Sequence, residues 1–416
     1  MRRLAWAGLM RAPGKTATRV VVLAAAVALL GGMVLFIGNS LRTVSHNAVT
    51  AVPLDLQGPV PSYAKAQSVA AGIAKQPGVL QASATATAPL TKALHTGPAG
   101  ASSAGQGGVL AVPPDYLAHI KTFRLLQGGL KPGGVVLDQQ MAATLQAQIG
   151  DTVSLVTRPG AKPVPLTVSG VAIVGQADKL FQPLNPQTGP APAQPPANIA
   201  IVPIDTFAQK LAPTLRTITP ASAGSSVQPG AQDGVQWQVQ AQLDPGPLSS
   251  STPSNAYARA TQTTNRLERT LPGQVQFVDN LSDELNTAAG DALYAQTLYI
   301  MLAVPGALIA LGLAYLAALG TVERDRRDLS LLRARGATRR DLLRLAGIES
   351  AIVGVVAGLL GAAVALAAVE LLVAGGAQLT LARGLLTGGV CVALAIAGAA
   401  AARIGASFSV MRGSVA

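Results

Sequence analysis

The sequence predicts an α-helical membrane protein with four transmembrane helices and a large mixed α+β extracytoplasmic domain of two lobes, inserted between spans one and two. Two observations support this prediction. Half of the residues are hydrophobic and only 12% are charged, whereas an ordinary soluble domain has about 25% charged residues. In addition, four long segments contain no charged residue: 20–38, 292–322, 350–369 and 384–402. An α-helix needs roughly 20 apolar residues to cross a bilayer.

We therefore expect transmembrane helices at 20–38, 292–322, 347–373 and 384–402. The second segment is longer than one perpendicular span, so we expect part of it to form a stalk or the helix to tilt. Pro305 lies inside this segment, where it can kink the helix. The first segment also fits a cleaved signal peptide, but it is longer than the apolar core of about 7–15 residues in such peptides.

Positive charge predicts the orientation in the membrane. Lysine and arginine crowd into 1–19, 321–346 and 403–416, which together hold as many as the much longer stretch 39–291. Because positively charged flanks stay in the cytoplasm, we expect a cytoplasmic N-terminus at 1–19, a cytoplasmic segment at 323–346 and a cytoplasmic tail at 403–416. Abundant Ala, Gly and Arg are typical of a high-GC bacterium, so the expected location is a bacterial plasma membrane.

The formal charge of +12 is thus explained by topology. It predicts contact with membrane lipid rather than with a nucleic acid.

The extracytoplasmic domain, 39–291, is expected to be mixed α+β because short strand and helix patterns alternate along it. Its Gly-, Ser- and Pro-rich segments are interpreted as loops: 95–108, 182–198, 219–234 and 244–254. The expected strands are 135–137, 152–156, 166–174, 199–202, 235–241 and 275–278. The expected helices are 63–75, 139–148, 205–211 and 257–270. The helix-rich ends, about 39–92 and 255–290, are expected to form one lobe beside the membrane, with the β-rich middle as the second.

The sequence contains no pattern that indicates an active site. Gly14-Lys15-Thr16 resembles the end of a phosphate-binding loop, but Leu9 occupies the position where that motif requires glycine. We expect no catalytic residue, no metal site and no cofactor in this chain. The other candidates are interpreted as surface, loop or transmembrane residues: His46, His95, His119, Asp283, Glu284 and Cys391.

The cytoplasmic segment 323–346 has a more specific pattern. Leu329 and Leu332 form an apolar stripe at i, i+3 spacing among basic residues. Gly336 favours a helix end, and Thr338 with Asp341 forms a capping box for the next helix. We expect a short amphipathic helix, a break, and a second helix that enters span three. The segment fits a docking helix for a cytoplasmic protein, or a loop that only fixes topology and rests its leucines on headgroups.

This segment resembles the FtsX-like permease family of ABC transporters, of the MacB/LolCE type. The residues that match are Glu323, Arg324, Asp328, Leu329, Leu332, Arg333, Ala334, Gly336, Ala337, Thr338 and Leu342. The extracytoplasmic domain resembles the outer domain of the same family, through 127–130, 135–138, 149–155 and 168–171. The resemblance covers nearly the whole chain and implies a MacB-like extracytoplasmic domain.

The resemblance implies a non-catalytic permease subunit that works with a separate ABC ATPase, on which ATP and Mg bind, in a homodimer or heterodimer of permeases. The residues implied in ATPase coupling are Glu323, Arg324, Asp328, Leu329, Leu332, Arg333, Gly336 and Thr338. The implied function is mechanotransmission, for the export or extraction of a lipid, lipoprotein, peptide or drug. The alternatives are a transmembrane activator of an extracellular cell-wall hydrolase and an ATPase-independent receptor or scaffold.

Glycines at four-residue spacing predict close packing of the last two spans. They are Gly354 and Gly358 in span three, and Gly384 and Gly388 in span four. The chain fits a complete half-type permease as well as the front half of a longer one.

Overall fold

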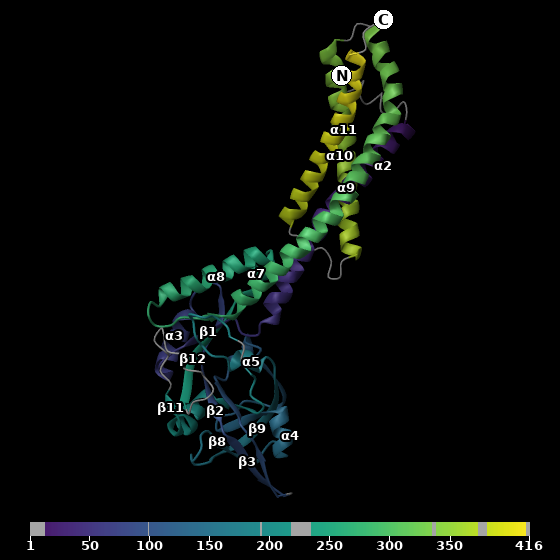
Figure 1. Ribbon diagram of the computed structural model, residues 1–416. Helices are drawn as coiled ribbons and strands as arrows, with labels where there is room; N and C mark the ends of the chain where they lie inside the picture. Colours follow the sequence, from purple (N-terminus) through teal and green to yellow (C-terminus); the bar gives the residue numbers. More distant parts are fainter. Residues whose placement is uncertain are drawn as a thin grey trace. The chain divides into compact units, whose positions relative to one another are not determined.

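The computed structural model describes residues 13–98, 100–191, 194–217, 234–334, 338–372 and 381–412. The chain forms two compact units, of which one is Arg42–Asp291 and the other comprises the segments before and after it (Figure 1). Most of the expected loop at 219–234, most of the connection after span three and the last residues of the tail lie outside the described residues.

The helical unit is formed by α2 (Pro13–Ala51), α9 (Asn280–Ala334), α10 (Arg339–Leu372) and α11 (Leu381–Arg412), of which α2 and α9 also extend into the other unit. Among the described residues, three stretches are long and apolar enough to cross a membrane: Thr16–Ala51, Arg344–Leu371 and Gly384–Ala401. The apolar run 292–322 lies within α9, which continues through Pro305.

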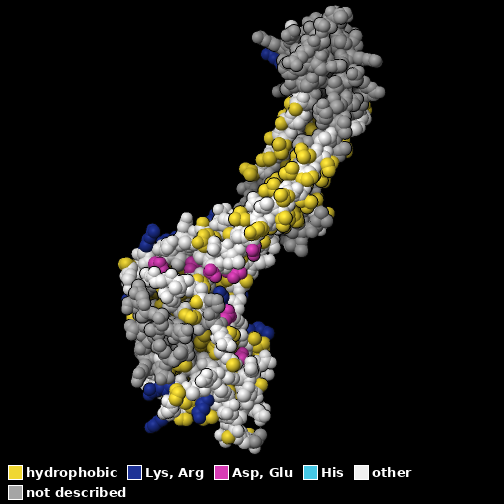
Figure 2. Space-filling model, viewed as in Figure 1, with side chains coloured by type: hydrophobic (Ala, Val, Ile, Leu, Met, Phe, Trp, Pro, Cys, Tyr) yellow, Lys and Arg dark blue, Asp and Glu magenta, His cyan; other side chains and the backbone are white. Residues whose placement is uncertain are grey.

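Hydrophobic side chains cover much of the visible surface of the long helices (Figure 2). In α9, Leu298, Met301 and Leu302 are all more than 60% exposed. A helix surface that is apolar outward as well as inward is typical of a protein whose surrounding solvent is lipid. This surface supports the assignment of the helical unit as a membrane unit.

Helices α10 and α11 approach closely because one of them carries glycine at the contact. A methyl group at Gly354 would lie 2.6 Å from Cα of Ile396, and one at Gly358 would lie 2.5 Å from Cα of Val392. No side chain larger than hydrogen fits at these distances without moving the α11 backbone. The two glycines therefore allow direct backbone-to-backbone packing.

Helix α10 also carries a glycine at its contact with α2. A methyl group at Gly361 would lie 2.8 Å from the carbonyl oxygen of Ala24. The second expected pair of packing glycines behaves differently, because no described atom lies within 4 Å of a methyl group placed on Gly384 or Gly388. Three glycines of α10 thus allow close helix packing, whereas the described residues show no packing partner for the second expected pair.

The unit Arg42–Asp291 is built on one mixed sheet, which in the described residues has 13 strands. Its main path contains, in spatial order, β13 (Val278–Asp279), β1 (Leu56–Pro59), β12 (Gly234–Leu243), β2 (Val79–Leu90), β5 (Gly107–Val112), β10 (Ile199–Pro203), β7 (Gly134–Asp138), β9 (Val164–Val174), β8 (Thr152–Val156), β3 (Lys92–Gly97) and β4 (Gly100–Ala104). Off this path, β6 (Phe123–Gly128) pairs with β9 and β11 (Arg216–Thr217) with β12. Strands from both ends of this unit and from its middle thus share one sheet.

The helices of the sheet domain are short, apart from the one that precedes α9. The short helices are α3 (Tyr63–Ile73), α4 (Gln139–Leu145), α5 (Ala177–Leu180), α6 (Ile204–Thr206) and α7 (Pro245–Ser249), and a short π-helix spans Phe207–Leu211. The longer helix is α8 (Pro253–Thr270). Ser62 begins α3 by accepting a hydrogen bond from the Lys65 amide. Leu267 and Ala260 of α8 are fully buried in the main core together with Ile73 of α3.

The centre of the sheet is buried on both faces. In β5, Val109 and Ala111 belong to the main core, whereas Leu110 and Val112 belong to a second core on the opposite face. A strand that is covered on both sides has a continuous apolar sequence, which explains why β5, β7 and β10 lack alternation.

Five expected strands match β7, β8, β9, β10 and β12, and the four expected helices match α3, α4, the α6 region and α8. The expected loop at 244–254 is wrong, because it contains α7 and the start of α8. The expected loop at 95–108 is also wrong, because this tract contains the end of β3, all of β4 and the start of β5. Its Gly, Ala and Ser residues have low strand propensity, and it is the pairing of β4 with β3 that makes it extended. The Ala-rich strand β2 has low strand propensity for the same reason and was not predicted. The strand expected at 275–278 begins only at Val278.

The glycine contact predicts a difference between two chemically identical substitutions. Gly358→Val should lower the stability of the helical unit by about 1–3 kcal/mol, because the side chain must push α11 away. Gly388→Val makes the same change in helix propensity at a site with open space and serves as the control.

The measurement is thermal unfolding in detergent. Unfolding is monitored by the labelling of Cys391, the single cysteine, which is buried in α11 and becomes accessible when the helices separate. Equal midpoints for the two variants would contradict the packing role of Gly358.

Candidate functional site

The strands β12 and β2 place a buried polar layer on the sheet face opposite the main core. In β12, Val239, Ala241 and Leu243 enter the main core, whereas Gln238 and Gln240 alternate with them and are fully buried on the other face. Buried amides must find hydrogen-bond partners or their desolvation is uncompensated. Tyr116 is one such partner, since its hydroxyl donates to Oε1 of Gln240 at 2.6 Å.

The helices α2 and α9 both join the sheet beside this polar layer. After α2 the chain passes through Asp55 into β1, and α9 begins at Asn280 directly after β13. The strands β1 and β13 pair antiparallel, with Leu56 opposite Asp279. The point where α9 starts is therefore next to the segment that follows α2, although more than 220 residues separate them in sequence.

Five side chains hold this point together, and we call them the junction cluster: Asp55, Gln57, Gln182, Asp279 and Asn280. Asn280 donates from its backbone nitrogen to the Asp55 carbonyl oxygen at 2.9 Å. Its side-chain amide donates to the Leu54 carbonyl oxygen at 3.1 Å and to Oε1 of Gln57 at 3.2 Å. Nε2 of Gln182 donates to Oε1 of Gln57 and, at 2.8 Å, to Oδ1 of Asn280. Three separate chain segments are thereby tied into one buried network.

Asp279 caps helix α9. Its Oδ1 accepts from the Ser282 backbone nitrogen at 2.7 Å, and its Oδ2 accepts from the hydroxyls of Ser282 and Thr264. A carboxylate at this position satisfies amides that the first helical turn leaves unpaired. Burial raises the pKa of Asp279, and these hydrogen bonds oppose the increase. The bond to Thr264 also attaches the start of α9 to α8.

Asp55 is the second carboxyl of the junction cluster, and it is almost completely buried. Its Oδ2 accepts from the Leu243 backbone nitrogen at 2.7 Å, whereas Oδ1 has no hydrogen-bond partner among the described residues. Burial raises the pKa of Asp55 to about 8, and the negative charge of Asp279 adds to the increase. At neutral pH the carboxyl therefore holds a proton, which avoids two buried negative charges at one site.

The junction cluster was not found by sequence analysis. The available signals were weak: Asp279 three residues before Ser282 is a capping pattern, and Asp55 is an isolated acidic residue in an apolar stretch. Of the acidic pair that was interpreted as solvated surface, Asp283 is exposed and Glu284 is half-buried. Sequence patterns that report local structure do not reveal which distant residues share a buried network.

The residues expected to couple to an ATPase lie in or beside α9. Six of them are within that helix: Glu323, Arg324, Asp328, Leu329, Leu332 and Arg333. The expectation of a short separate helix is wrong, because residues 323–334 continue α9 from the apolar run without a break. Gly336 lies outside the described residues; α9 ends at Ala334, and the exposed Thr338 directly precedes α10.

His95 is a correction to the expected surface histidines. It is 5% exposed in β3, with Nδ1 2.9 Å from the Leu145 carbonyl oxygen and Nε2 3.4 Å from Oδ2 of Asp151. Ser102 lies opposite His95 in the β3–β4 register, but its hydroxyl donates to the same Leu145 oxygen at 2.6 Å. Because both ring nitrogens are engaged, this group ties β3 and β4 to α4 and has no arrangement for nucleophilic catalysis.

The remaining single residues have the expected environments. His46 and His119 are exposed, and Cys391 is buried inside α11. The described part of the chain contains no cluster of His, Cys, Asp and Glu that would hold a metal ion.

The proton on Asp55 predicts a pH dependence of stability. In the unfolded chain Asp55 has a pKa near 3.8, whereas in the folded protein it is about 8. Between these values the folded state binds more protons, so the free energy of unfolding falls as pH rises from about 4 to 8. We expect Asp55→Asn to remove this fall, because the amide is neutral throughout.

Thermal midpoints of the wild type and of Asp55→Asn, measured at about pH 5 and about pH 8, test this expectation. Asp115→Asn, at an exposed position, is the control and should keep the wild-type pH dependence. A wild type and an Asp55→Asn variant with the same pH dependence would refute the buried proton.

The amide network predicts a large cost for removing Asn280. Asn280→Ala leaves the Leu54 carbonyl and the Gln182 amide buried without their partner, which costs about 1–3 kcal/mol. Asn265→Ala, at an exposed position of α8, should change stability by less than about 0.5 kcal/mol. Chemical denaturation of the detergent-solubilised chain measures both, and losses of similar size would speak against the network.

Comparison with known protein families identifies both parts of the chain. Residues 16–278 match the MacB-like periplasmic core domain, and residues 299–414 match the FtsX-like permease C-terminal domain. A search of curated proteins finds no significant match. The first family alone covers more than half of the chain and ends at the junction cluster, directly before α9 begins. With its apolar helices and its mixed α/β domain, the chain is a membrane protein that belongs to the FtsX/MacB/LolCE-type family of ABC transporter permeases.

Proposed function

We propose that this chain is the permease subunit of an ABC transporter and couples ATP hydrolysis on a separate ATPase to movement of its sheet domain. One observation carries the proposal: α2 and α9, the two helices that extend beyond the sheet domain, are joined to that domain at the same buried junction cluster. A displacement of either helix therefore acts on the same strands, β1 and β13.

The proposed topology has four spans, with 292–322 of α9 as the second. The three apolar stretches and the long helix α9 support this count. The excess of Lys and Arg at 1–19, 323–346 and 403–416 supports a cytoplasmic position for these segments. The sheet domain then lies outside the plasma membrane of a bacterium.

Helix α9 is proposed as the element that transmits force. It contains 55 residues, which corresponds to about 80 Å at 1.5 Å per residue. Its cytoplasmic end holds Leu329 and Leu332 among charged residues, a pattern that suits docking into a groove on a partner. ATP and Mg bind on that partner, and Gly336 and Thr338 belong to the same proposed coupling segment.

Mechanotransmission explains the composition of the spans better than a polar conduit does. Their apolar runs contain no charged residue, whereas polar pathways through membranes are lined by polar or ionisable groups. We propose that two permeases act as a homodimer or heterodimer, and that their sheet domains move a lipid, lipoprotein, peptide or drug on the outer side.

Leu332→Asp tests the docking helix. A charge in the apolar stripe should abolish association with the ATPase, because the carboxylate loses its hydration in an apolar groove. The measurement is affinity capture of the tagged permease from native membranes, with the ATPase identified by mass spectrometry. Leu332→Met keeps the apolar volume and is the matched control, and the amount of each variant in the membrane fraction reports insertion.

Two results would contradict the proposal. Undiminished capture of the ATPase by Leu332→Asp would refute the docking role of this stripe. Failure of the wild type to capture any ATPase, with and without nucleotide, would refute the permease role and favour a membrane receptor or scaffold.

A further inference from the structure

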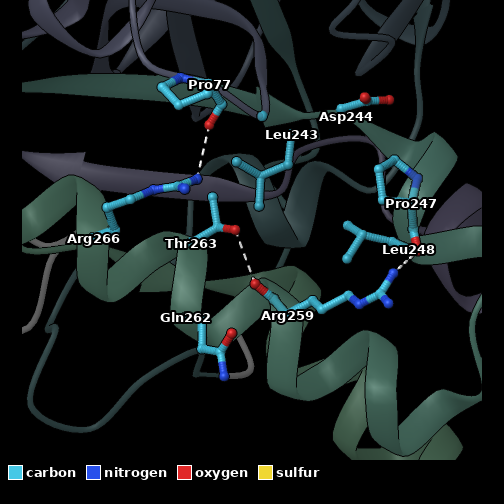
Figure 3. Close-up of a pocket in the computed structure, with 10 residues that line it drawn as sticks. Pro77, Leu243, Asp244, Pro247, Leu248, Arg259, Gln262, Thr263 and Arg266 are labelled. Carbon is cyan, nitrogen blue, oxygen red and sulfur yellow. Dashed lines mark hydrogen bonds between the residues drawn. The ribbon is translucent and has the colours of Figure 1, made fainter.

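The sheet domain has an open cleft that the proposed coupling does not use (Figure 3). It has a volume of about 320 Å³ and lies between α7, α8, the turn before β2 and the end of β12. The residues that line it are Pro77, Gly78, Leu243, Asp244, Pro247, Leu248, Arg259, Gln262, Thr263 and Arg266.

Two arginines of α8 are held in place along the cleft. Nη1 of Arg259 donates to the Pro247 carbonyl oxygen at 3.1 Å, and Nη2 of Arg266 donates to the Pro77 carbonyl oxygen at 2.8 Å. Each bond uses one of the five N–H donors of a guanidinium group. Both groups are therefore oriented by the main chain and retain donors for a ligand.

The cleft between the two cations is apolar. Figure 3 shows Leu243 between the guanidinium groups of Arg259 and Arg266, and Leu243 and Leu248 are both buried. The acidic lining residue, Asp244, has its Oδ1 committed to the Gly246 amide at 3.0 Å, where it caps α7. The cleft therefore has two cations beside an apolar floor, with the Asp244 carboxylate at the start of α7.

The turn before β2 is adapted to this arrangement. Gly78 has φ +85°, a conformation that favours glycine, and a methyl group placed on it would lie 3.6 Å from Nη2 of Arg266. The backbone oxygen of Gly78 accepts from the Asp244 amide at 3.0 Å. This bond holds the turn against the end of β12, so the carbonyl that orients Arg266 is itself fixed.

We propose that this cleft binds an extended acidic peptide segment, with one carboxylate on each arginine and apolar atoms over Leu243. Arg259 and Arg266 are seven residues apart on α8, which corresponds to about 10 Å along the helix. The two guanidinium groups bond to different carbonyl oxygens, those of Pro247 and Pro77, so each is able to take its own carboxylate. In a polyproline II segment, side chains three residues apart project from the same side about 9 Å from each other.

Such a peptide forms a charge-assisted contact with each arginine. Each guanidinium group is able to donate two N–H hydrogen bonds to its carboxylate. The ligand class is therefore a protein partner or cargo with acidic residues at i and i+3 in an extended segment. This proposal requires neither an ATPase nor a nucleotide, so its outcome is independent of the proposed function.

The test uses the full chain in detergent and a fluorescein-labelled peptide, Pro-Glu-Pro-Pro-Glu-Pro, with binding measured by fluorescence anisotropy at low salt. We expect saturable binding that weakens as salt is added. Arg259→Gln and Arg266→Gln should each weaken it by at least about tenfold, equivalent to about 1.4 kcal/mol. Arg269→Gln removes an exposed charge of the same helix that does not line the cleft, and it should bind like the wild type.

A second peptide separates specific binding from general attraction to a basic surface. Replacing both glutamates by glutamine keeps the extended shape and should weaken binding by at least about tenfold. The proposal is overturned if the glutamate peptide does not bind at about 1 mM. It is also overturned if the glutamine peptide binds equally well, or if Arg269→Gln weakens binding as much as the two cleft variants. Circular dichroism of each variant verifies that its fold is intact.

Discussion

The structure depends on one physical constraint, which is that the hydrogen-bonding groups at the start of α9 are buried and must be satisfied without water. Asn280 has the central position, because its backbone and side chain bind the Asp55 and Leu54 carbonyls and the Gln57 amide. Each of these groups would carry a desolvation cost if its partner moved away. The start of α9 therefore has one well-defined position on β1, and this fixes the attachment of the longest helix to the sheet.

The chemistry of this attachment combines neutral amides with carboxyls that are either protonated or strongly hydrogen-bonded. Gln57, Gln182 and Asn280 supply donors and acceptors without charge, so their burial costs little once they are paired. Asp55 holds its proton at neutral pH, whereas Asp279 receives hydrogen bonds from the first turn of α9 and from Thr264. The result is a hydrogen-bonded attachment that contains no buried salt bridge among the described residues.

The helical unit achieves close packing by different means, because lipid provides no hydrophobic drive for helix association. Glycines of α10 bring its backbone next to α11 and α2, and this gains dispersion contacts along the helices. The sheet domain, in contrast, is stabilised by two apolar cores and a polar layer. A chain with few aromatic residues thus folds both units from small and aliphatic side chains, and α9 belongs to both.

The sequence by itself determined the features that depend on local composition and period. Uncharged runs predicted the apolar helices, short strand patterns predicted β12 and β8, and the segment around Leu332 indicated the permease family, which the two matching domains confirm. Only the tertiary structure decided the features that depend on distant partners. The Ala-rich strand β2 and the Gly-, Ala- and Ser-containing strand β4 are extended because neighbouring strands pair with them. His95 is buried because α4 covers it. The junction cluster joins residues more than 220 positions apart. Local patterns do not contain this information, because a buried polar group is defined by the partner that folding brings to it.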